Sequence, residues 1–360
     1  MPPVRTFTSS VLDPYERGLE FGAHHVDELL RTIAAYREVF RARALGPFDV
    51  ELWARRAWAA IGDLTPWAVE EIRGIADGAD VPVHEIAALN ARTELLAIAN
   101  PTGIPECSAV VSLPPGGHPV AAQTWDWYEA MSDCWLIWTI PFPDGRVVTA
   151  LTEYGVLAKI GVSSTGLGVL FNKLLHASDA LVPLGYPVHL LSRRILETAW
   201  DTGEAIGYAK EISVSASSAV TVVDRAGRAA SLELFPGGLG VVEPVDGLLV
   251  RTNHFDSAAG QPGCLAATVG PGSVIRQDTL RSRLAGPPPD SADEVLDAMH
   301  DHAAVGGVCA HVDESLEPAL RHATLATVVI DVAQPSTQSS LKATVGGPCA
   351  RESLRTSSRT

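Results

Sequence analysis

The sequence contains no long apolar run, and this absence argues against a membrane-spanning helix. A helix needs about 20 predominantly apolar residues to cross a bilayer, but no run of eighteen consecutive apolar residues occurs among the 360 residues. The uncharged stretch 107–125 is interrupted by prolines, glycines, His118 and Gln123. The opening residues, MPPVRTF, lack the charged and apolar regions of a secretory signal peptide. We therefore expect a cytoplasmic protein without a membrane partner.

Basic residues are scarce as well. The chain has 27 Lys+Arg against 42 Asp+Glu, which gives a formal net charge of −15 at pH 7. A surface of this sign repels phosphate backbones and anionic lipids, so we expect no nucleic-acid partner. The 46% of hydrophobic residues are enough to form a large core, which excludes a disordered chain.

The sequence also lacks paired cysteines and clusters with metal-ligand spacing. The five cysteines are an odd number and include no CxxC pair, which argues against a disulfide framework and a zinc knuckle. The run His300, Asp301, His302 resembles metal-ligand spacing only superficially, because at helical pitch these side chains point in different directions. No phosphate-binding loop of the GxxxxGK type occurs. We therefore assign no metal and no cofactor.

The sequence patterns that are present predict helices in the first hundred residues and mainly strands after them. Asp13-Pro14 and Thr65-Pro66 each supply a cap and a first-turn proline, the former for a helical segment that extends to about Leu45. From residue 107, short β-type runs alternate with turn signals such as PPGG and PDG. Helical periodicity returns at about 187–212, 273–284 and 292–302, and the tail 350–360 is predicted to be disordered. Because hairpin turns rather than helices join the strands, we expect an α+β fold with largely antiparallel sheets packed on each other and helical layers outside.

Cys107 is the first residue of interest because it lies where the breaker-rich linker GIPE meets the first β-run. A free cysteine at a strand start is commonly a small buried hydrophobe. The next β-run, however, places Asp126 within the aromatic sequence QTWDW. A buried carboxylate needs a cationic or hydrogen-bonding partner, so the two residues together indicate a functional site.

Five motifs carry a resemblance to a known family. ECSAVV and AAQTWDW, preceded by NARTEL and followed by GLGVLFN and VRTNH, resemble the acyl-coenzyme A:6-aminopenicillanic acid acyltransferase family of N-terminal-nucleophile hydrolases. The resemblance extends from about residue 10 to 350 and implies a four-layer αββα sandwich. It also implies an inactive precursor that cuts its own Glu106–Cys107 bond. Residues 1–106 would then be a helical pro-segment and 107–360 the fragment that carries the nucleophile, with both held together in one compact domain.

The resemblance implies a chemistry in which Cys107 provides both nucleophile and base. Cleavage frees the α-amine of Cys107, and an α-amine has a reference pKa of about 7.7–8.0, so it can take the proton of its own thiol. The implied substrate is an acyl amide or thioester of a small peptide-like or secondary-metabolite molecule. Whether the acyl group passes to water or to an amine stays open, and so does the use of coenzyme A.

The remaining site residues are carried over one at a time from the family motifs. Asp126 would orient the α-amine or the thiol, and Asn253 of VRTNH would donate its side-chain amide to the oxyanion. Asn172 of VLFNKL would add a second polar contact near the acyl carbonyl. Arg321, just before HATLATVVID, would pair with Asp126 or the scissile region. Each has a structural alternative as a turn, capping or loop residue.

Two other functions remain open at this stage. One is a non-catalytic binding protein that keeps the fold without processing, which is compatible with Thr124 at the position where the family usually has asparagine. The other is a papain-type thiol hydrolase, which would require one of the 11 histidines.

Overall fold

The computed structural model describes residues 3–102, 107–303, 306–333 and 340–350. Within these residues, no helix is both long enough and apolar enough to span a bilayer. The tail predicted to be disordered, apart from Ala350, and the proposed cleavage position Glu106 both fall outside the described residues.

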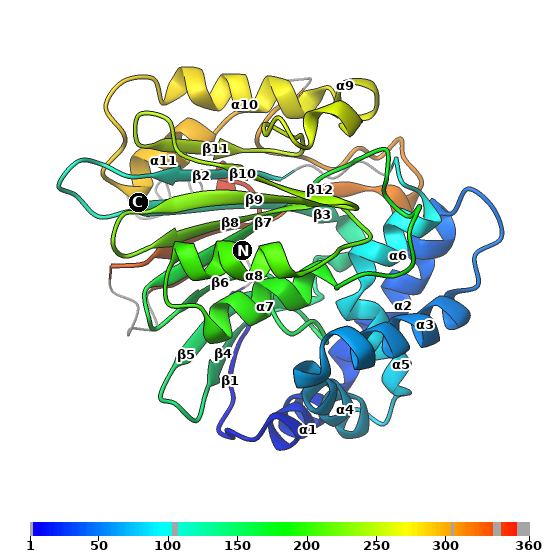
Figure 1. The fold of residues 1–360 in the computed structure, drawn as a ribbon. Coiled ribbons are helices and arrows are strands. Elements are labelled where there is room, and N and C mark those ends of the chain that lie inside the picture. The colour runs from blue at the N-terminus through cyan, green and yellow to red at the C-terminus, as the bar shows by residue number, and fades with distance from the viewer. Residues whose placement is uncertain (1–2, 103–106, 304–305, 334–339, 351–360) are drawn as a thin grey trace, which may run out of the picture.

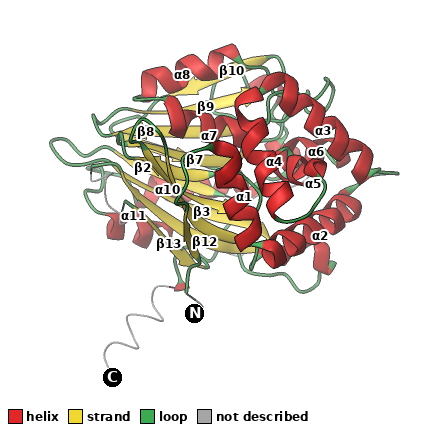
Figure 2. Cartoon of the chain, turned by 90° about the horizontal axis from the view of Figure 1, so that it is seen from below, coloured by secondary structure: helices red, strands yellow, loops and turns green. Residues whose placement is uncertain are grey.

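The N-terminal region is helical, as predicted. After the short strand β1 (Thr6–Thr8), its elements are α1 Pro14–His24, α2 Val26–Arg43, α3 Val50–Leu64, η1 Pro66–Ala68, α4 Val69–Gly78, α5 Val83–Asn90 and α6 Arg92–Ala99. Figures 1 and 2 show α1–α6 gathered beside the sheets rather than across their faces.

Two details of this region differ from the sequence expectation. The predicted segment from Pro14 to about Leu45 is two helices, because the backbone leaves helical geometry at His25 (φ −125°, ψ 34°). Asp13 caps the first of them as predicted, accepting a hydrogen bond from Glu16 N at 3.1 Å. Thr65 does not cap the later helix, because its hydroxyl donates instead to Ile61 O at 2.9 Å. Both predicted starts are correct, because η1 begins at Pro66 with Thr65 at the N-cap position, but only Asp13 caps its helix with its side chain.

Helices α1 and α4 approach each other backbone to backbone. A Cβ added at Gly18 would lie 2.2 Å from Glu71 O, and one added at Gly74 would lie 2.1 Å from Tyr15 O. Only glycine permits this approach, and the approach brings Arg17 of α1 against Glu71 of α4, with Arg17 Nη2 2.6 Å from Glu71 Oε2.

The larger sheet, here called sheet A, has eight strands in the spatial order β1-β4-β5-β6-β7-β8-β9-β10. The bounds after β1 are β4 Trp135–Pro141, β5 Val147–Glu153, β6 Ile160–Ser163, β7 Leu167–Lys173, β8 Ser218–Asp224, β9 Ala229–Phe235 and β10 Gly238–Val242. All neighbouring strands are antiparallel except β1 and β4, which are parallel. The prediction of largely antiparallel sheets is confirmed, whereas β1 is too short to give a sequence signal.

The smaller sheet, sheet B, has five strands in the order β11-β2-β3-β12-β13, all antiparallel. Their bounds are β2 Ser108–Ser112, β3 Val120–Tyr128, β11 Leu248–Arg251, β12 His322–Asp331 and β13 Leu341–Val345.

Helices cover the outer faces of both sheets. Sheet A carries α7 (Val188–Thr198) and α8 (Thr202–Glu211), while sheet B carries α10 (Gly272–Arg283) and α11 (Ala292–Met299). The shorter elements are α9 Ala266–Val269, η2 Glu129–Met131, η3 Gln261–Gly263 and η4 Pro318–Leu320. Because the inner faces of the sheets pack on each other, the molecule is a four-layer αββα sandwich, as expected (Figure 1).

The register of sheet B determines which residues share one end of it. Ser108 pairs with Thr124 of β3, and Ala109 pairs with Arg251 of β11. Cys107 immediately precedes β2, so it lies level with the end of β3 that carries Asp126 and with the chain just after β11. Three segments distant in sequence thus meet at one edge of the sandwich.

Candidate active site

Cys107 is buried at this edge, with 4% of its surface exposed. Its backbone N–H donates to Asn253 Oδ1 at 2.9 Å. Asn253 follows β11 by two residues, and its own backbone N–H donates to Ser273 Oγ at 2.7 Å. The asparagine predicted from the VRTNH motif therefore contacts the predicted nucleophile directly.

The carbonyl oxygen of Cys107 accepts hydrogen bonds from two further side chains. Asn172 Nδ2, from β7 of the opposite sheet, lies 3.1 Å away, and Arg276 Nη1, from α10, lies 3.0 Å away. Arg276 Nη2 also donates to Asn253 Oδ1 at 3.0 Å. The backbone of Cys107 is thus fixed from both sheets and from the helical layer over sheet B.

Arg276 was missed by the sequence analysis. It lies in the helical segment GSVIRQDTLRSR, which has three arginines, and spacing alone does not show which of them faces the sheet. In the structure Arg276 is 1% exposed. The available signal was the amphipathic periodicity of 273–284, which could have identified Arg276 only if the buried face had been known.

The Cys107 thiol lies against the strand that carries Asp126. Its Sγ donates to the backbone carbonyl of Asp126 at 3.6 Å, and the Asp126 side chain is buried. Burial, followed by the negative charge of Asp126, raises the pKa of the Cys107 thiol to about 11. In the continuous chain the thiol is therefore protonated at neutral pH and needs a base to become a nucleophile.

A buried charged cluster lies beside the cysteine on the sheet A side. Lys159 Nζ lies 3.7 Å from Glu153 Oε2 and 3.7 Å from the centre of the Trp125 ring. Burial lowers the pKa of Lys159 to about 7, although Glu153 opposes that shift. Burial also acts to raise the pKa of Glu153, but Arg92 and Lys159 overcome it and the resulting pKa is below its ordinary value. Lys159 was not singled out from the sequence, where a single lysine after a turn gives no distinctive pattern.

Two side chains of β3 make hydrogen bonds to neighbouring strands around the site. Thr124 Oγ1 accepts from Ser108 N at 3.2 Å. Gln123 reaches across to sheet A, where its Oε1 accepts from Phe171 N at 3.0 Å and its amide donates to Phe171 O. Phe171 precedes Asn172, so this cross-sheet contact places Asn172 beside Cys107.

Arg321 is placed differently from the other predicted residues. Its guanidinium donates to Glu314 O at 2.9 Å and to Leu316 O at 3.1 Å, both carbonyls of the preceding loop. The hydrogen bonds of Arg321 within the described residues therefore hold that loop rather than Cys107. Its predicted pairing with Asp126 or the scissile region stays a prediction.

His254, next to Asn253, contacts polar side chains other than Cys107. Its Nδ1 lies 2.8 Å from Ser273 Oγ and its Nε2 lies 3.4 Å from Asp256 Oδ1. Among the described residues, the hydrogen bonds of Cys107 involve no histidine.

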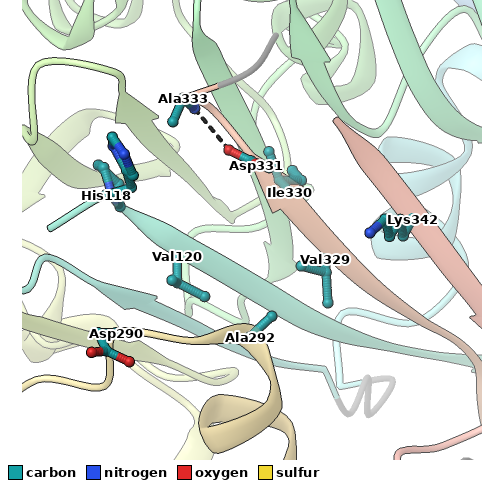
Figure 3. A pocket seen from close by; sticks show the side chains of 10 residues that line it. His118, Val120, Asp290, Ala292, Val329, Ile330, Asp331, Ala333 and Lys342 are labelled. Carbon is teal, nitrogen blue, oxygen red and sulfur yellow. Dashed lines mark hydrogen bonds between the residues drawn. The ribbon is translucent and has the colours of Figure 1, made fainter. Parts of the chain in front are cut away.

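A separate cavity of about 440 Å³ opens at the other end of β3 (Figure 3). It is lined by residues that include His118, Asp290, Asp331 and Lys342. Val120, which begins β3 and lines this cavity, is six residues from Asp126, or roughly 20 Å along a strand. The cavity is thus distinct from the site around Cys107.

The architecture defines the fold class of the protein. Two stacked, largely antiparallel sheets between helical layers form the four-layer arrangement of the N-terminal-nucleophile hydrolase fold. The chain belongs to the acyl-coenzyme A:6-aminopenicillanic acid acyl-transferase family, whose family model matches residues 121–344. The matched range begins after Cys107 and includes Asp126, Asn172, Asn253 and Arg321. The resemblance inferred from the motifs is confirmed.

Comparison with individual proteins gives partial matches. The chain is 36% identical over 197 residues to the acyl-coenzyme A:6-aminopenicillanic-acid-acyltransferase 40 kDa form of Emericella nidulans, and the match covers 52% of each chain. It thus spans about half the length of this curated relative.

Solved structures with a similar fold include a penicillin V acylase and a bile acid hydrolase. The penicillin V acylase of Agrobacterium tumefaciens is 15% identical with a TM-score of 0.43, covering 62% of this chain and 80% of that one. A mutant of the conjugated bile acid hydrolase of Clostridium perfringens is 13% identical with a TM-score of 0.44, covering 66% of this chain and 92% of that one.

Proposed function

We propose that the protein is a self-processing amidohydrolase or acyltransferase whose nucleophile is the thiol of Cys107. The observation that carries this proposal is the set of contacts around the Cys107 backbone. Its nitrogen is held by Asn253 Oδ1 at 2.9 Å, and its carbonyl oxygen by Asn172 and Arg276. A purely structural cysteine at a strand start needs no such array of buried polar side chains.

Self-processing would begin with attack of Cys107 Sγ on the carbonyl carbon of Glu106. The Glu106–Cys107 C–N bond breaks, the departing nitrogen takes the thiol proton, and a thioester forms. Water then hydrolyses the thioester to give the carboxylate of Glu106 and a free thiol on Cys107. The products are the fragments 1–106 and 107–360.

The new α-amine would be the base that the buried thiol lacks in the continuous chain. It stays at the position of the Cys107 nitrogen, where Asn253 Oδ1 accepts its hydrogen bond. Arg276 Nη2 lies 3.0 Å from the same oxygen, and its positive charge disfavours protonation of the amine. A neutral amine next to the thiol can take the thiol proton and later return it to the leaving group.

In turnover, the thiolate attacks the acyl carbonyl of an amide or thioester, and the leaving group departs with the proton. The acyl group then resides on Cys107 until water or a bound amine accepts it. Asn253 carries two amide N–H donors, of which one binds Lys173 O at 2.9 Å, and we assign the other to the oxyanion. Asp126 would orient the amine or the thiol.

The substrate would be an acylated small molecule of the peptide-like or secondary-metabolite class. The relative's name supplies acyl-coenzyme A as one acyl donor and 6-aminopenicillanic acid as one acceptor. Both are acyl-transfer partners of the kind that a Cys107 acyl-enzyme would use, and neither is a resident cofactor.

Intact-mass spectrometry tests the proposal. Wild-type protein should resolve into the fragments 1–106 and 107–360, while the Cys107→Ala variant should keep the full-length mass. Processed protein should then release acyl groups from N-acyl amino acids, penicillins or acyl thioesters. Wild-type protein that remains whole after prolonged incubation and turns over none of these compounds would instead indicate a binding protein that keeps the fold.

A further inference from the structure

A second group of reactive side chains lies on sheet B, outside the candidate active site. The side chains of His302, His311 and Cys349 approach so closely that their ligand atoms all lie within 4.8 Å of one another. His302 follows α11, His311 lies in the loop before β12, and Cys349 follows β13. Three separate segments therefore bring two imidazoles and a thiol to one point.

This convergence differs from the expectation based on the sequence alone. The expectation that His300 and His302 diverge assumed helical pitch, but α11 ends at Met299. Beyond that end, the rings of His300 and His302 have centres 4.9 Å apart, and those of His302 and His311 lie 5.1 Å apart. The loop before β12 supplies His311, and the segment after β13 supplies Cys349. Local spacing in the sequence could not show that these two residues lie beside His302.

Hydrogen bonds to β12 hold both outer segments in place. Ala310 N donates to Thr324 Oγ1 at 2.9 Å, and Thr324 N donates to Ala310 O at 3.0 Å. After β13, Gly346 N donates to Leu325 O at 2.9 Å. His311 and Cys349 are thus attached to the first residues of the same strand, β12, and their proximity follows from the sheet itself.

A second thiol lies within the same group. A Cβ built on Gly347 would lie 3.4 Å from the Sγ atoms of both Cys309 and Cys349. Cys309 is buried and its thiol donates to Met299 O at 3.7 Å, whereas Cys349 is half-buried and both His302 and His311 are exposed. The ligand atoms of the exposed side chains are accessible to an ion from solvent.

We propose that His302, His311 and Cys349 form a zinc-binding site that fastens the C-terminal segment to the loop before β12. Imidazole nitrogen and thiolate sulfur are both ligands of Zn²⁺, which binds them at about 2.0–2.1 Å and about 2.3 Å, and a water molecule would fill the fourth tetrahedral position. Ligand atoms in a tetrahedral site lie roughly 3.5 Å apart, so modest rotations of the two exposed imidazoles would close the group. Binding releases the thiol proton of Cys349 to solvent.

The site would act as a structural clasp rather than in acyl transfer. Thr324, to which the loop is bonded, pairs with Asp126 of β3. A metal ion that joins the loop to the segment after β13 would therefore stiffen the strand beside the candidate active site. The proposal does not depend on the function of Cys107.

Titration of the reduced full-length protein with Co²⁺ and then Zn²⁺ tests the site. We expect one Co²⁺ per chain, a thiolate-to-cobalt charge-transfer band in the near ultraviolet, and loss of that band when Zn²⁺ is added. We also expect Zn²⁺ to raise the Tm of the wild type. The variants Cys349→Ser, His302→Ala and His311→Ala should each bind at least about tenfold more weakly, and the first should lose the charge-transfer band.

Cys264→Ser is the matched control, because Cys264 carries a half-buried thiol and its backbone forms an isolated β-bridge with His176, away from this group. It should bind Co²⁺ like the wild type. The metal-free variants should keep the wild-type circular dichroism spectrum, which separates loss of a ligand from loss of the fold. Wild-type protein that shows no charge-transfer band, or a band that survives in Cys349→Ser or in both histidine variants, would overturn the proposal.

Discussion

Asn253 holds the Cys107 backbone and is our proposed donor to the oxyanion. Its Oδ1 accepts hydrogen bonds from Cys107 N and from Arg276 Nη2. We predict that Asn253→Ala lowers kcat by about 10²–10³-fold, because one oxyanion donor typically contributes that much. The fold should survive. Steady-state kinetics on processed protein checks the prediction.

Asn90→Ala is a suitable control for this change. Asn90 is also buried, and its amide donates to Ile86 O within α5 and to Gly155 O in the loop between β5 and β6. Its loss should lower the stability but leave kcat of the folded fraction within a few-fold of wild type. Equal losses of kcat in both variants would show that Asn253 acts only through the fold.

Arg276 should control the pH at which the enzyme becomes active. Its positive charge lies near the Cys107 nitrogen, so replacing it by methionine should raise the pKa of the processed α-amine. Because the neutral amine is the active base, the acid limb of the kcat/KM profile should move to higher pH. Arg276→Lys keeps the charge and should keep the limb near its wild-type position, and superimposable profiles for Arg276→Met and wild type would contradict the assignment.

At the residue scale, motifs found the side chains whose neighbours in sequence are distinctive. Cys107 after a linker, Asp126 in an aromatic strand and Asn253 in VRTNH all lie at the same edge of the sandwich. Arg276 and Lys159 were not found, because their burial follows from the packing of a helix and of a second sheet on the site. No local pattern carries that information.

At the scale of elements, buried ion pairs join the N-terminal helices to α7 in the layer over sheet A. Glu71 of α4 accepts from Arg17 of α1 at 2.6 Å and from Arg193 of α7 at 2.8 Å. We predict that Glu71→Ala lowers the free energy of unfolding by about 3–5 kcal/mol, because it leaves two buried guanidinium groups without their carboxylate. Urea denaturation measures the change.

The exposed neighbour Glu70 provides the comparison. It pairs with Arg73 at 3.2 Å on the helix surface, with both side chains about half exposed. Glu70→Ala should lower the free energy of unfolding by less than about 1 kcal/mol. A Glu71→Ala cost as small as that of Glu70→Ala would mean that the buried triad contributes little.

The Glu71 contribution should depend on pH in a defined direction. Burial acts to raise the pKa of Glu71, but Arg193 and Arg17 overcome it, so the pKa in the folded protein lies below the ordinary value of 4.5. The stabilisation is then fully present above about pH 4.5 and is lost as the pH falls through the lower folded pKa. The difference in stability between wild type and Glu71→Gln should therefore shrink in acid, and a difference that grows below pH 4.5 would contradict this sign.

The succession of elements was largely predictable, because turn residues and hydrophobic period mark most strands and helices. The break at His25 was not predictable, because the helical periodicity of the sequence continues across it. Strand β1 was missed because three residues give no period.

At the scale of the whole molecule, the described parts of the segments 1–106 and 107–360 share one interior. Side chains from both belong to the same hydrophobic cluster, and β1 adds to sheet A beside β4. Arg92 also binds Glu153 across the two segments, with Nη2 2.5 Å from Oε2. We predict that the fragments of processed protein co-elute in size-exclusion chromatography and separate only in denaturant; separate elution in native buffer would contradict this.

The proposed chemistry requires Cys107 to become the first residue of the mature fragment. Sequential N-terminal degradation of the larger fragment, isolated from a preparation with measured acyl-transfer or hydrolytic activity, tests this most directly. We expect the sequence Cys-Ser-Ala-Val. Active protein in which Cys107 remains joined to Glu106 would contradict it.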